Sequence, residues 1–171
     1  MTGSDSSELV LDASAFYAGI PFQSSRKCYS TKAVYEEVKH IRRAYAALDA
    51  LIDSGNLTIL EPEESSLSRV IDTAKMTGDI QELSIADISI IALALQLKKT
   101  LISDDYAIGN ISAFLKIPIK TIAFGGIGKL RRWIGFCNAC GRAYKPYTRI
   151  CTVCGSRVMR RFKDIREIHQ E

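Results

Sequence analysis

The sequence lacks the marks of several large protein classes. No apolar run approaches the roughly 20 residues that a membrane-spanning helix needs, and the longest, Ile85–Leu95, is interrupted by Asp87. The first residues do not show the basic and then apolar pattern of a signal peptide. Neither a G-x-x-x-x-G-K-S/T phosphate-binding loop nor a G-x-G-x-x-G dinucleotide fingerprint is present. We therefore expect a soluble, cytoplasmic protein with no membrane partner.

Two further absences narrow the chemistry. The first predicted strand ends in Asp12, Ala13 and Ser14, so the second aspartate of a D-x-D phosphatase is missing. A phosphorelay receiver would carry an acidic pair before its first helix and a lysine at the end of a late strand, and neither is in place. Other hydrolytic chemistry on an α/β fold stays open.

What the sequence does contain is enough for one ordinary α/β domain and a small module. It has 171 residues, of which 47% are hydrophobic and 25% charged. The net charge of +4 conceals an asymmetry, because residues 129–171 hold 11 of the 23 lysines and arginines but only 3 of the 19 acids. Such a basic segment favours polyanions through counterion release. Alternatively, these charges only keep a small module in solution.

Four of the five cysteines form two C-x-x-C pairs, namely Cys137 with Cys140 and Cys151 with Cys154. In an intracellular chain this spacing predicts metal binding rather than disulfides. Four thiolates close a tetrahedral site, so we expect one structural Zn²⁺. The ion would supply on the order of 10 kcal/mol of folding free energy to a module too small to fold alone. The fifth cysteine, Cys28, lies in a predicted loop and is expected to be a free thiol.

Short apolar runs alternate with helical periods along most of the chain. Strands are predicted at 8–12, 57–60, 100–103 and 119–123, and helices at 13–18, 31–41, 44–52, 67–76, 84–95 and 106–116. A loop is predicted at 19–29 from its Gly, Pro and Ser content. This alternation implies an α/β fold, a mostly parallel sheet with helices on both faces. Glycines then mark a linker at 125–130, which divides a domain at 1–124 from a small β module and basic tail at 131–171.

Several acids stand where such a sheet would gather functional groups, at or near the carboxyl ends of its strands. Asp12, Asp104 and Asp105 follow predicted strands. Asp87 stands in the first turn of a helix, and Glu37 lies with Glu36 on another. Converging carboxylates repel unless a hard divalent cation such as Mg²⁺ or Mn²⁺ joins them. Such a site can activate water for phosphodiester hydrolysis.

Each of these acids also has a purely structural interpretation. Asp12 and Asp104 could cap the helices that follow their strands, and Ser84 with Asp87 approximates a capping box. The adjacent glutamates at 36 and 37 could form a solvated helix face, and at most one of them can point into a site. Taken together in their strand–helix context, the acids favour a metal site.

The motifs around these acids resemble a known family. The chain reads VLDASAF at the first strand, TKAVYEEV at Thr31–Val38, TGD at Thr77–Asp79, LSIADISIIALAL at Leu83–Leu95 and SDDYAIGN at Ser103–Asn110. In this order the motifs are similar to a PIN domain. With the cysteine pairs they resemble the archaeal Nob-one type, an endonuclease that trims the 3′ end of small-subunit ribosomal RNA and ends in a zinc ribbon. The resemblance runs from about Leu9 to Met159.

The resemblance implies a catalytic set that binds Mg²⁺ or Mn²⁺. Its members would be Asp12, Glu37, Asp87 and Asp105, with Asp104 as a second acid at the same strand end. Glu37 rather than Glu36 matches the end of the T-x-x-V-x-x-E-V pattern. The resemblance also implies hydrolysis that leaves 5′-phosphate and 3′-hydroxyl ends. We further expect Ser84 and Ser103 to hydrogen-bond the carboxylates.

Basic and aromatic residues alternate in the cysteine module, a composition that suits phosphate contacts and base stacking. We expect RNA contacts from Arg131, Arg132, Arg142, Lys145, Arg149 and Arg157. Alternatively, the aromatic side chains only form the module's small core.

Together, these features predict a divalent-metal-dependent endoribonuclease. Its substrate would be the small-subunit rRNA precursor in a pre-ribosomal particle. Two alternatives stay open: a non-catalytic RNA-binding assembly factor on the same fold, and a toxin-type PIN ribonuclease. Toxin-type enzymes are usually smaller and lack the ribbon.

Overall fold

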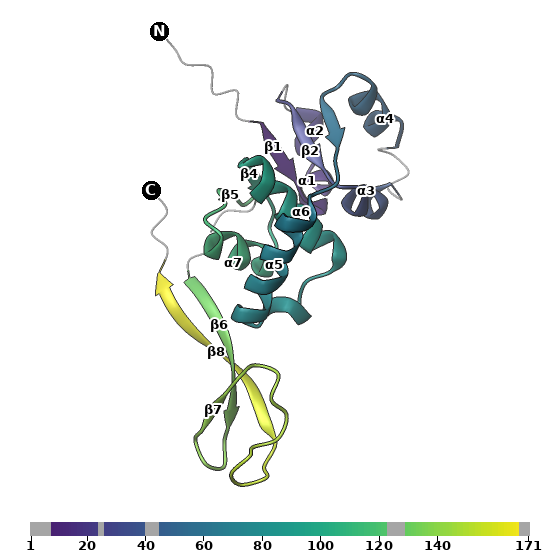
Figure 1. Ribbon diagram of the computed structural model, residues 1–171. Coiled ribbons are helices and arrows are strands. Elements are labelled where there is room, and N and C mark those ends of the chain that lie inside the picture. Colours follow the sequence, from purple (N-terminus) through teal and green to yellow (C-terminus); the bar gives the residue numbers. More distant parts are fainter. Residues whose placement is uncertain (1–7, 24–25, 40–44, 123–128, 168–171) are drawn as a thin grey trace.

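The computed structural model describes residues 8–23, 26–39, 45–122 and 129–167. Figure 1 shows two parts, a sheet flanked by helices and a long β arm that extends away from it. Among the described residues, no helix is long and apolar enough to cross a membrane.

The larger part is built on a sheet of five parallel strands in the order β3-β2-β1-β4-β5. Helices flank this sheet, so the predicted α/β fold is confirmed (Figure 1). Its elements are β1 (Leu9–Leu11), α1 (Ala13–Tyr17), α2 (Ile20–Gln23), β2 (Cys28–Ser30), α3 (Lys32–Val38), α4 (Tyr45–Asp53), β3 (Leu57–Ile59), α5 (Glu64–Thr77), the 3₁₀ turn η1 (Asp79–Gln81), α6 (Ile85–Leu97), β4 (Thr100–Ile102), α7 (Tyr106–Phe114) and β5 (Ile119–Lys120).

Local sequence fixes where several helices begin and end. Thr31 caps α3, its hydroxyl accepting a bond from the backbone N–H of Val34. Ser84 and Asp87 form a reciprocal capping box at the start of α6. Gly78 ends α5 in the left-handed conformation, with φ of 87°.

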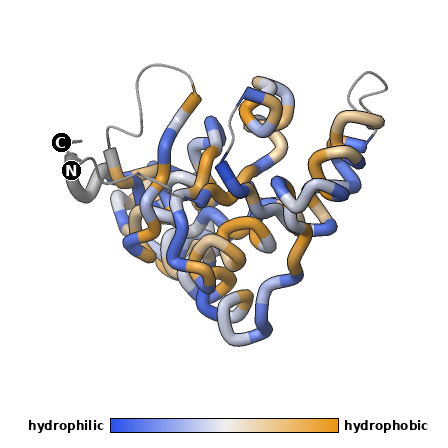
Figure 2. Tube along the Cα trace, turned by 90° about the horizontal axis from the view of Figure 1, so that it is seen from above, coloured by the Kyte–Doolittle hydropathy of each residue, from blue (hydrophilic) through white to orange (hydrophobic). Residues whose placement is uncertain are grey.

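The core lies between the sheet and its helices. Helix α6 is buried along most of its length, from Ala86 to Ala94, as expected for a helix with few polar side chains. Figure 2 shows hydrophobic and hydrophilic residues alternating along the trace of the other elements.

The prediction of a loop at 19–29 is wrong. Residues 20–23 form helix α2, and Cys28–Ser30 form strand β2, which lies between β1 and β3. The segment is too short to show a strand period, and its β structure depends on pairing with both neighbours. Cys28 is a free thiol as predicted, but it is 1% exposed, and burial raises its pKa.

The smaller part is a three-stranded antiparallel sheet in the order β7-β6-β8. Its strands are β6 (Lys129–Cys137), β7 (Ala143–Tyr144) and β8 (Val158–Glu167). The predicted linker at 125–130 falls mostly on residues outside the described ranges. The exact domain boundary therefore stays a prediction.

Candidate active site and metal centre

Asp12 lies at the carboxyl end of β1 and is 6% exposed. Its Oδ2 accepts hydrogen bonds from the hydroxyls of Ser103, at 2.8 Å, and Ser14, at 3.1 Å. Burial nevertheless raises the pKa of Asp12, and the negative charge of Asp87 adds to this rise. The expected bond from Ser103 is confirmed, whereas Ser14 was missed. A hydroxyl two residues after a strand-ending aspartate is the signal that could have found it.

Glu37 and Asp87 are the two other carboxylates in this electrostatic cluster with Asp12. Burial raises the pKa of Glu37, and the charges of Asp87 and Asp12 raise it further. Strand β1 and helices α3 and α6 therefore bring three acids within electrostatic reach of one another. Glu36 and Glu37 are both exposed, but Glu36 forms an ion pair with Lys39, the residue that ends the same helix.

Asp104 and Asp105 are both engaged by backbone groups. Asp105 Oδ1 caps α7 by accepting from Ile108 N at 3.0 Å, and its own N–H donates to Ser103 Oγ. Asp104 Oδ1 accepts from Ile122 N at 2.7 Å, so Asp105 rather than Asp104 is the helix cap. Ser103 thus connects Asp105 to Asp12 through two hydrogen bonds.

The acids surround one edge of the sheet without closing on a single point. In the described part of the chain, the only three or more ligand atoms close enough to share one ion belong to cysteines. Asp87 Oδ2 accepts from the backbone N–H of Ser84, so the hydroxyl of Ser84 does not bond a carboxylate. Burial and the negative charge of Asp87 nevertheless raise the pKa of both Asp12 and Glu37, and a bound cation would relieve this unfavourable electrostatic state.

Cys137 ends β6, and the other three cysteines lie in the turns between β6 and β8. These turns form the far end of the β arm (Figure 1). All four sulfurs lie within 4.8 Å of one another. The separations of Cys137 from Cys154 and of Cys140 from Cys151 are both 3.5 Å. This is well beyond the roughly 2.05 Å of a disulfide and suits four thiolates at about 2.3 Å from one Zn²⁺. The donor set therefore fits zinc.

Matching turns build the two halves of this cluster. Gly141 N–H donates to the Cys137 carbonyl at 2.8 Å, and Gly155 N–H donates to the Cys151 carbonyl at 3.0 Å. Both glycines have positive φ, 72° and 69°. The Tyr144 hydroxyl lies 3.0 Å from Cys151 Sγ and lowers the pKa of this thiol to about 5, which favours the thiolate that a metal needs.

Comparison with known proteins matches both parts. Residues 9–97 match the family described as "PIN domain of ribonuclease". "Endoribonuclease Nob1" of Pyrococcus abyssi is 39% identical over 153 residues, which cover 88% of this chain and 91% of that protein. The protein of the same name from Methanothermobacter thermautotrophicus is 36% identical over 159 residues, covering 89% and 91%. The chain belongs to the Nob1 endoribonuclease family. In Saccharomyces cerevisiae, the "20S-pre-rRNA D-site endonuclease NOB1" is 35% identical over 78 residues, covering 46% of this chain and 17% of the yeast protein.

The smaller part of this Nob1-family chain, residues 129–167, is called the ribbon below. Most of the basic residues expected to contact RNA are exposed on it. The exposed ones are Arg132, Arg142, Lys145, Arg149 and Arg157. Arg149 and Arg157 line a cavity of about 400 Å³ together with Arg160. Arg131 differs, because its half-buried guanidinium stacks on the rings of Tyr106, at 4.7 Å, and Phe162, at 4.4 Å.

A buried polar network joins the ribbon to the PIN domain. The carboxylate of Asp79, 1% exposed, accepts from Asn110 Nδ2 at 2.7 Å and from Trp133 Nε1 at 2.9 Å. Asn110 also bonds the backbone of Arg131 on β6. The sequence analysis did not predict this network, because neither Asp79 nor Asn110 stands in a metal-binding pattern.

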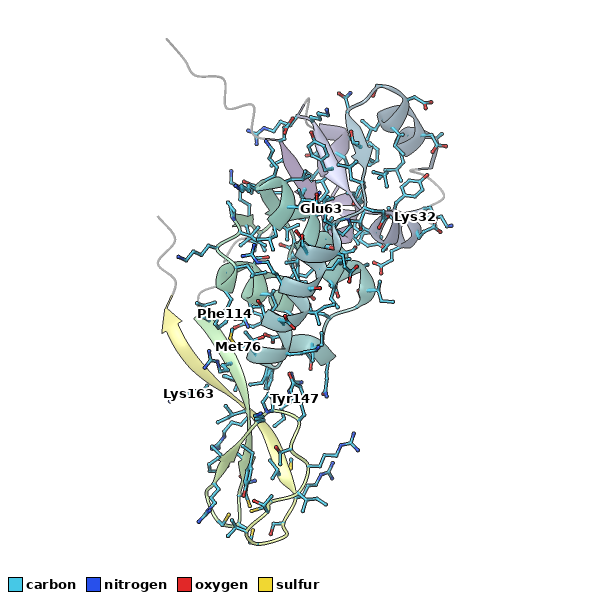
Figure 3. All side chains as sticks on the ribbon, in the orientation of Figure 1. Lys32, Glu63, Met76, Phe114, Tyr147 and Lys163 are labelled. Carbon is cyan, nitrogen blue, oxygen red and sulfur yellow. The ribbon has the colours of Figure 1, made fainter. Side chains whose placement is uncertain are left out.

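Two more contacts fix the ribbon near the end of α5. The hydroxyl of Tyr147 donates to the Lys75 carbonyl at 2.5 Å, and Figure 3 shows Tyr147 beside the end of this helix near Met76. Arg160 donates to the Gly78 carbonyl and forms an ion pair with Glu82. Both parts of the Nob1-family chain therefore meet over α5 and η1.

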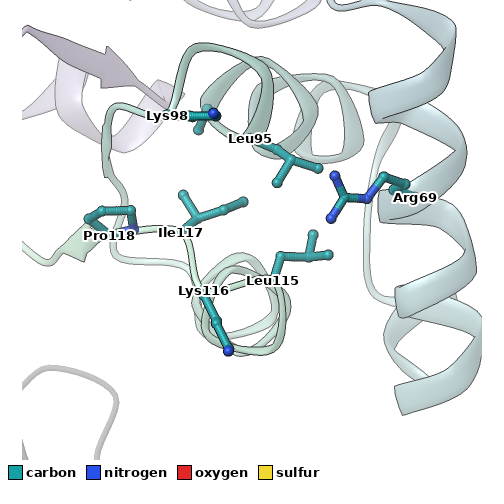
Figure 4. Close-up of a pocket in the computed structure, with 8 residues that line it drawn as sticks. Arg69, Leu95, Lys98, Leu115, Lys116, Ile117 and Pro118 are labelled. Carbon is teal, nitrogen blue, oxygen red and sulfur yellow. The ribbon is translucent and has the colours of Figure 1, made fainter.

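Another cavity, of about 440 Å³, lies at the opposite end of the sheet beside the starts of β4 and β5 (Figure 4). It is lined by Arg69, Ala94, Leu95, Lys98, Leu115, Lys116, Ile117 and Pro118, and none of these was predicted to be functional. Lys98 and Lys116 follow helices in the left-handed conformation, where a positive side chain complements the helix dipole. Their positions thus have a structural explanation.

Proposed function

We propose that this Nob1-family protein is a divalent-metal-dependent endoribonuclease that cuts the small-subunit rRNA precursor within a pre-ribosomal particle. Relatives named as endoribonucleases, one of them a pre-rRNA endonuclease, support this assignment. A role in ribosome biogenesis implies a cytoplasmic protein. The structural observation that carries the proposal is the buried carboxylate of Asp12, which shares one edge of the sheet with Glu37 and Asp87.

The proposed catalytic set is Asp12, Glu37, Asp87 and Asp105, with Asp104 beside it. These carboxylates would hold Mg²⁺ or Mn²⁺, because hard cations prefer oxygen ligands. When bound, such an ion polarises a phosphodiester and activates a water for in-line attack.

Hydroxyl groups prepare this set for its ligand. Ser103 and Ser14 both donate to one oxygen of Asp12 and so fix the direction in which the carboxylate points. Ser103 also accepts from the backbone of Asp105, which ties the two acids to one hydroxyl. The two serines therefore orient the carboxylate of Asp12, which would hold the ion together with the other acids.

The ribbon has a separate proposed role. Its four cysteines would hold one Zn²⁺ as a structural ion, and its exposed arginines and Lys145 would contact RNA phosphates. Among the six basic residues expected to bind RNA, Arg131 would act mainly by packing at the junction. The ribbon and the extent of the match to full-length Nob1 relatives weigh against a toxin-type ribonuclease.

Single-turnover cleavage of a precursor RNA fragment in Mn²⁺ tests this proposal. We expect Asp12→Asn to lower the rate at least about 100-fold while RNA binding stays near that of the wild type. Glu37→Gln should also slow cleavage strongly. Glu36→Gln is the matched control, because this neighbouring glutamate is paired with Lys39 and should leave the rate near wild type.

Two outcomes would count against the proposal. A wild-type protein that binds the fragment but does not cut it would favour the non-catalytic assembly factor. Cleavage that survives Asp12→Asn in a folded protein would show that the acids serve only as caps and surface charges.

A further inference from the structure

A second pocket opens where the ribbon meets the PIN domain. This cavity, the junction pocket, has a volume of about 280 Å³. It is lined by Asp79, Glu82, Asp105, Tyr106, Ala107 and Trp133. Asp105, Tyr106 and Ala107 come from the start of α7, the other two acids from η1 and the residue after it, and Trp133 from β6. The ribbon therefore contributes one wall of the pocket, through Trp133.

The aromatic walls of the junction pocket are held in place. The indole N–H of Trp133 donates to Asp79, and its ring meets Phe162 edge-on at 5.6 Å. Tyr106 lies under the guanidinium of Arg131. Both rings are partly exposed, Tyr106 by 36%. Fixed, partly exposed rings are the platforms on which unpaired bases stack.

The charge of the walls decides what can enter. Three of the six lining residues are acids, and the guanidiniums of Arg131 and Arg160, which lie against Tyr106 and Trp133, offset only part of their charge. An uncharged group is therefore a better occupant than a phosphate. A nucleobase is flat, uncharged and able to donate hydrogen bonds. Carboxylates only accept, so they favour bases that offer more N–H donors. An exocyclic amino group offers two, whereas uracil offers only its N3–H between two carbonyls.

Glu82 is the acid best placed to make this choice. Asp79 already accepts from Asn110 and Trp133, and Asp105 belongs to the proposed catalytic set. Glu82 uses Oε1 to pair with Arg160. Its second oxygen accepts no hydrogen bond from the described residues, and the side chain is 49% exposed.

The junction pocket also lies next to the proposed chemistry. Asp105 lines it and is connected to Asp12 through Ser103. A base in this pocket would therefore belong to a nucleotide beside the bond that is cut. The position of the base beside the cleaved bond rests on the proposed nuclease function, whereas the binding of a base in the pocket does not.

We propose that the junction pocket takes up one unstacked nucleobase that carries an exocyclic amino group. Tyr106 and Trp133 provide the stacking surfaces, and Glu82 is the residue that selects adenine, cytosine or guanine over uracil. The ribbon thus contributes a wall of a base-selective subsite as well as phosphate contacts.

Trp133 is the one tryptophan of the chain, so its fluorescence reports on the junction pocket. The probes are short single-stranded oligoadenylate, oligocytidylate and oligouridylate, titrated into the zinc-loaded full chain without added Mg²⁺ or Mn²⁺. We expect the first two to quench Trp133 at concentrations at least about tenfold lower than oligouridylate, the factor that corresponds to one selective charged hydrogen bond.

Variants separate stacking from selection. Tyr106→Leu should weaken quenching by oligoadenylate about tenfold, since one base–aromatic stack is lost, whereas Tyr106→Phe should behave like the wild type. Glu82→Gln should reduce the preference over oligouridylate, because an amide can donate to a uracil carbonyl. A reduced preference in Glu82→Gln would show that the stronger stacking of adenine is not the sole cause of the preference over oligouridylate. Tyr17→Leu, at a tyrosine that is 65% exposed elsewhere, is the control and should change neither property.

The result is independent of cleavage. Base-selective quenching in a protein that cuts no RNA would support the pocket and refute the nuclease. Equal quenching by all three probes, or a preference that survives both Tyr106→Leu and Glu82→Gln with zinc content intact, would overturn the pocket proposal even if the protein cleaves RNA.

Discussion

The side-chain amide of Asn110 bonds the backbone of Arg131 in both directions. Asn110 Nδ2 donates to the Arg131 carbonyl at 2.9 Å, and its Oδ1 accepts from the Arg131 N–H at 3.0 Å. The amide therefore satisfies both backbone groups of one residue of β6, as a neighbouring strand would. Because Asn110 lies on α7, whose cap is Asp105, ribbon and proposed active site share one helix.

Replacing this amide should loosen the ribbon. Asn110→Leu removes one of the two side-chain donors to the carboxylate of Asp79 and both bonds from the amide to the backbone of Arg131. We expect a loss of about 1–3 kcal/mol in the free energy of unfolding. Urea unfolding followed by Trp133 fluorescence measures it. Asn138→Leu is the control, because Asn138 is exposed on the ribbon. A loss no larger than that of the control would mean that the network does not hold the ribbon.

Zinc should stabilise the cysteine end of the ribbon. We expect about one Zn²⁺ per chain by elemental analysis. Cys140→Ser should abolish this and unfold the turns that carry the cysteines, while the PIN domain keeps its hydrogen-exchange protection. Cys28→Ala removes a thiol outside the cluster and should keep the zinc. A zinc-free ribbon with native exchange rates would contradict this prediction.

Carboxylate repulsion should appear in the pH dependence of stability without divalent ions. Because the pKa of Asp12 is raised in the folded protein, its proton is held more tightly there than in the unfolded chain. The contribution of Asp12 to the free energy of unfolding should therefore be highest at acidic pH and should fall as pH rises from about 4 through the raised pKa. Glu37 adds in the same direction.

Asp12→Asn should flatten this fall and be at least as stable as the wild type at neutral pH. Added Mg²⁺ should stabilise the wild type more than the variant. Urea unfolding at several pH values, with and without Mg²⁺, checks both statements. A variant that is less stable than the wild type at neutral pH without Mg²⁺ would point to a capping role for Asp12.

The ribbon's arginines should set the salt dependence of RNA binding. Neutralising Arg149 and Arg157 together should reduce the slope of log K against log salt by about 1.4, at roughly 0.7 per phosphate contact on single strands. Fluorescence anisotropy over a salt series measures this slope. The matched double substitution of Arg69 and Lys116 by Gln, at the cavity of Figure 4, should leave the slope unchanged. Equal effects of the two pairs would indicate non-specific charge.

Sequence patterns predicted the elements with strong local signals. Helix α6 combines a capping box at Ser84 with a long apolar run, and the cysteine pairs carry their spacing in the chain itself. Strand β2 had no such signal, since its three residues are a strand only through their two neighbours. Pairing across the sheet is information that a short segment does not contain.

The same distinction applies to the site. Asp12, Asp104 and Asp105 could be named from their places after strands and Asp87 from its place in the first turn of a helix, whereas the choice of Glu37 over Glu36 needed the family motif. The double role of Asp105, helix cap and proposed ligand, could not be separated by spacing, because capping and metal binding both use a carboxylate at a helix start. Asp79 and Asn110 act across the junction, where sequence distance hides the contact.

Gly78 shows how closely the two parts are fitted. A Cβ on this residue would lie 2.6 Å from Cβ of Trp133 and 3.0 Å from Pro146, and its φ of 87° already disfavours other side chains. Gly78, which ends α5, is therefore also the point at which Trp133 and Pro146 of the ribbon pack closely against the PIN domain. A ribbon transplanted from an unrelated protein would keep its zinc but would lack this close fit against Gly78.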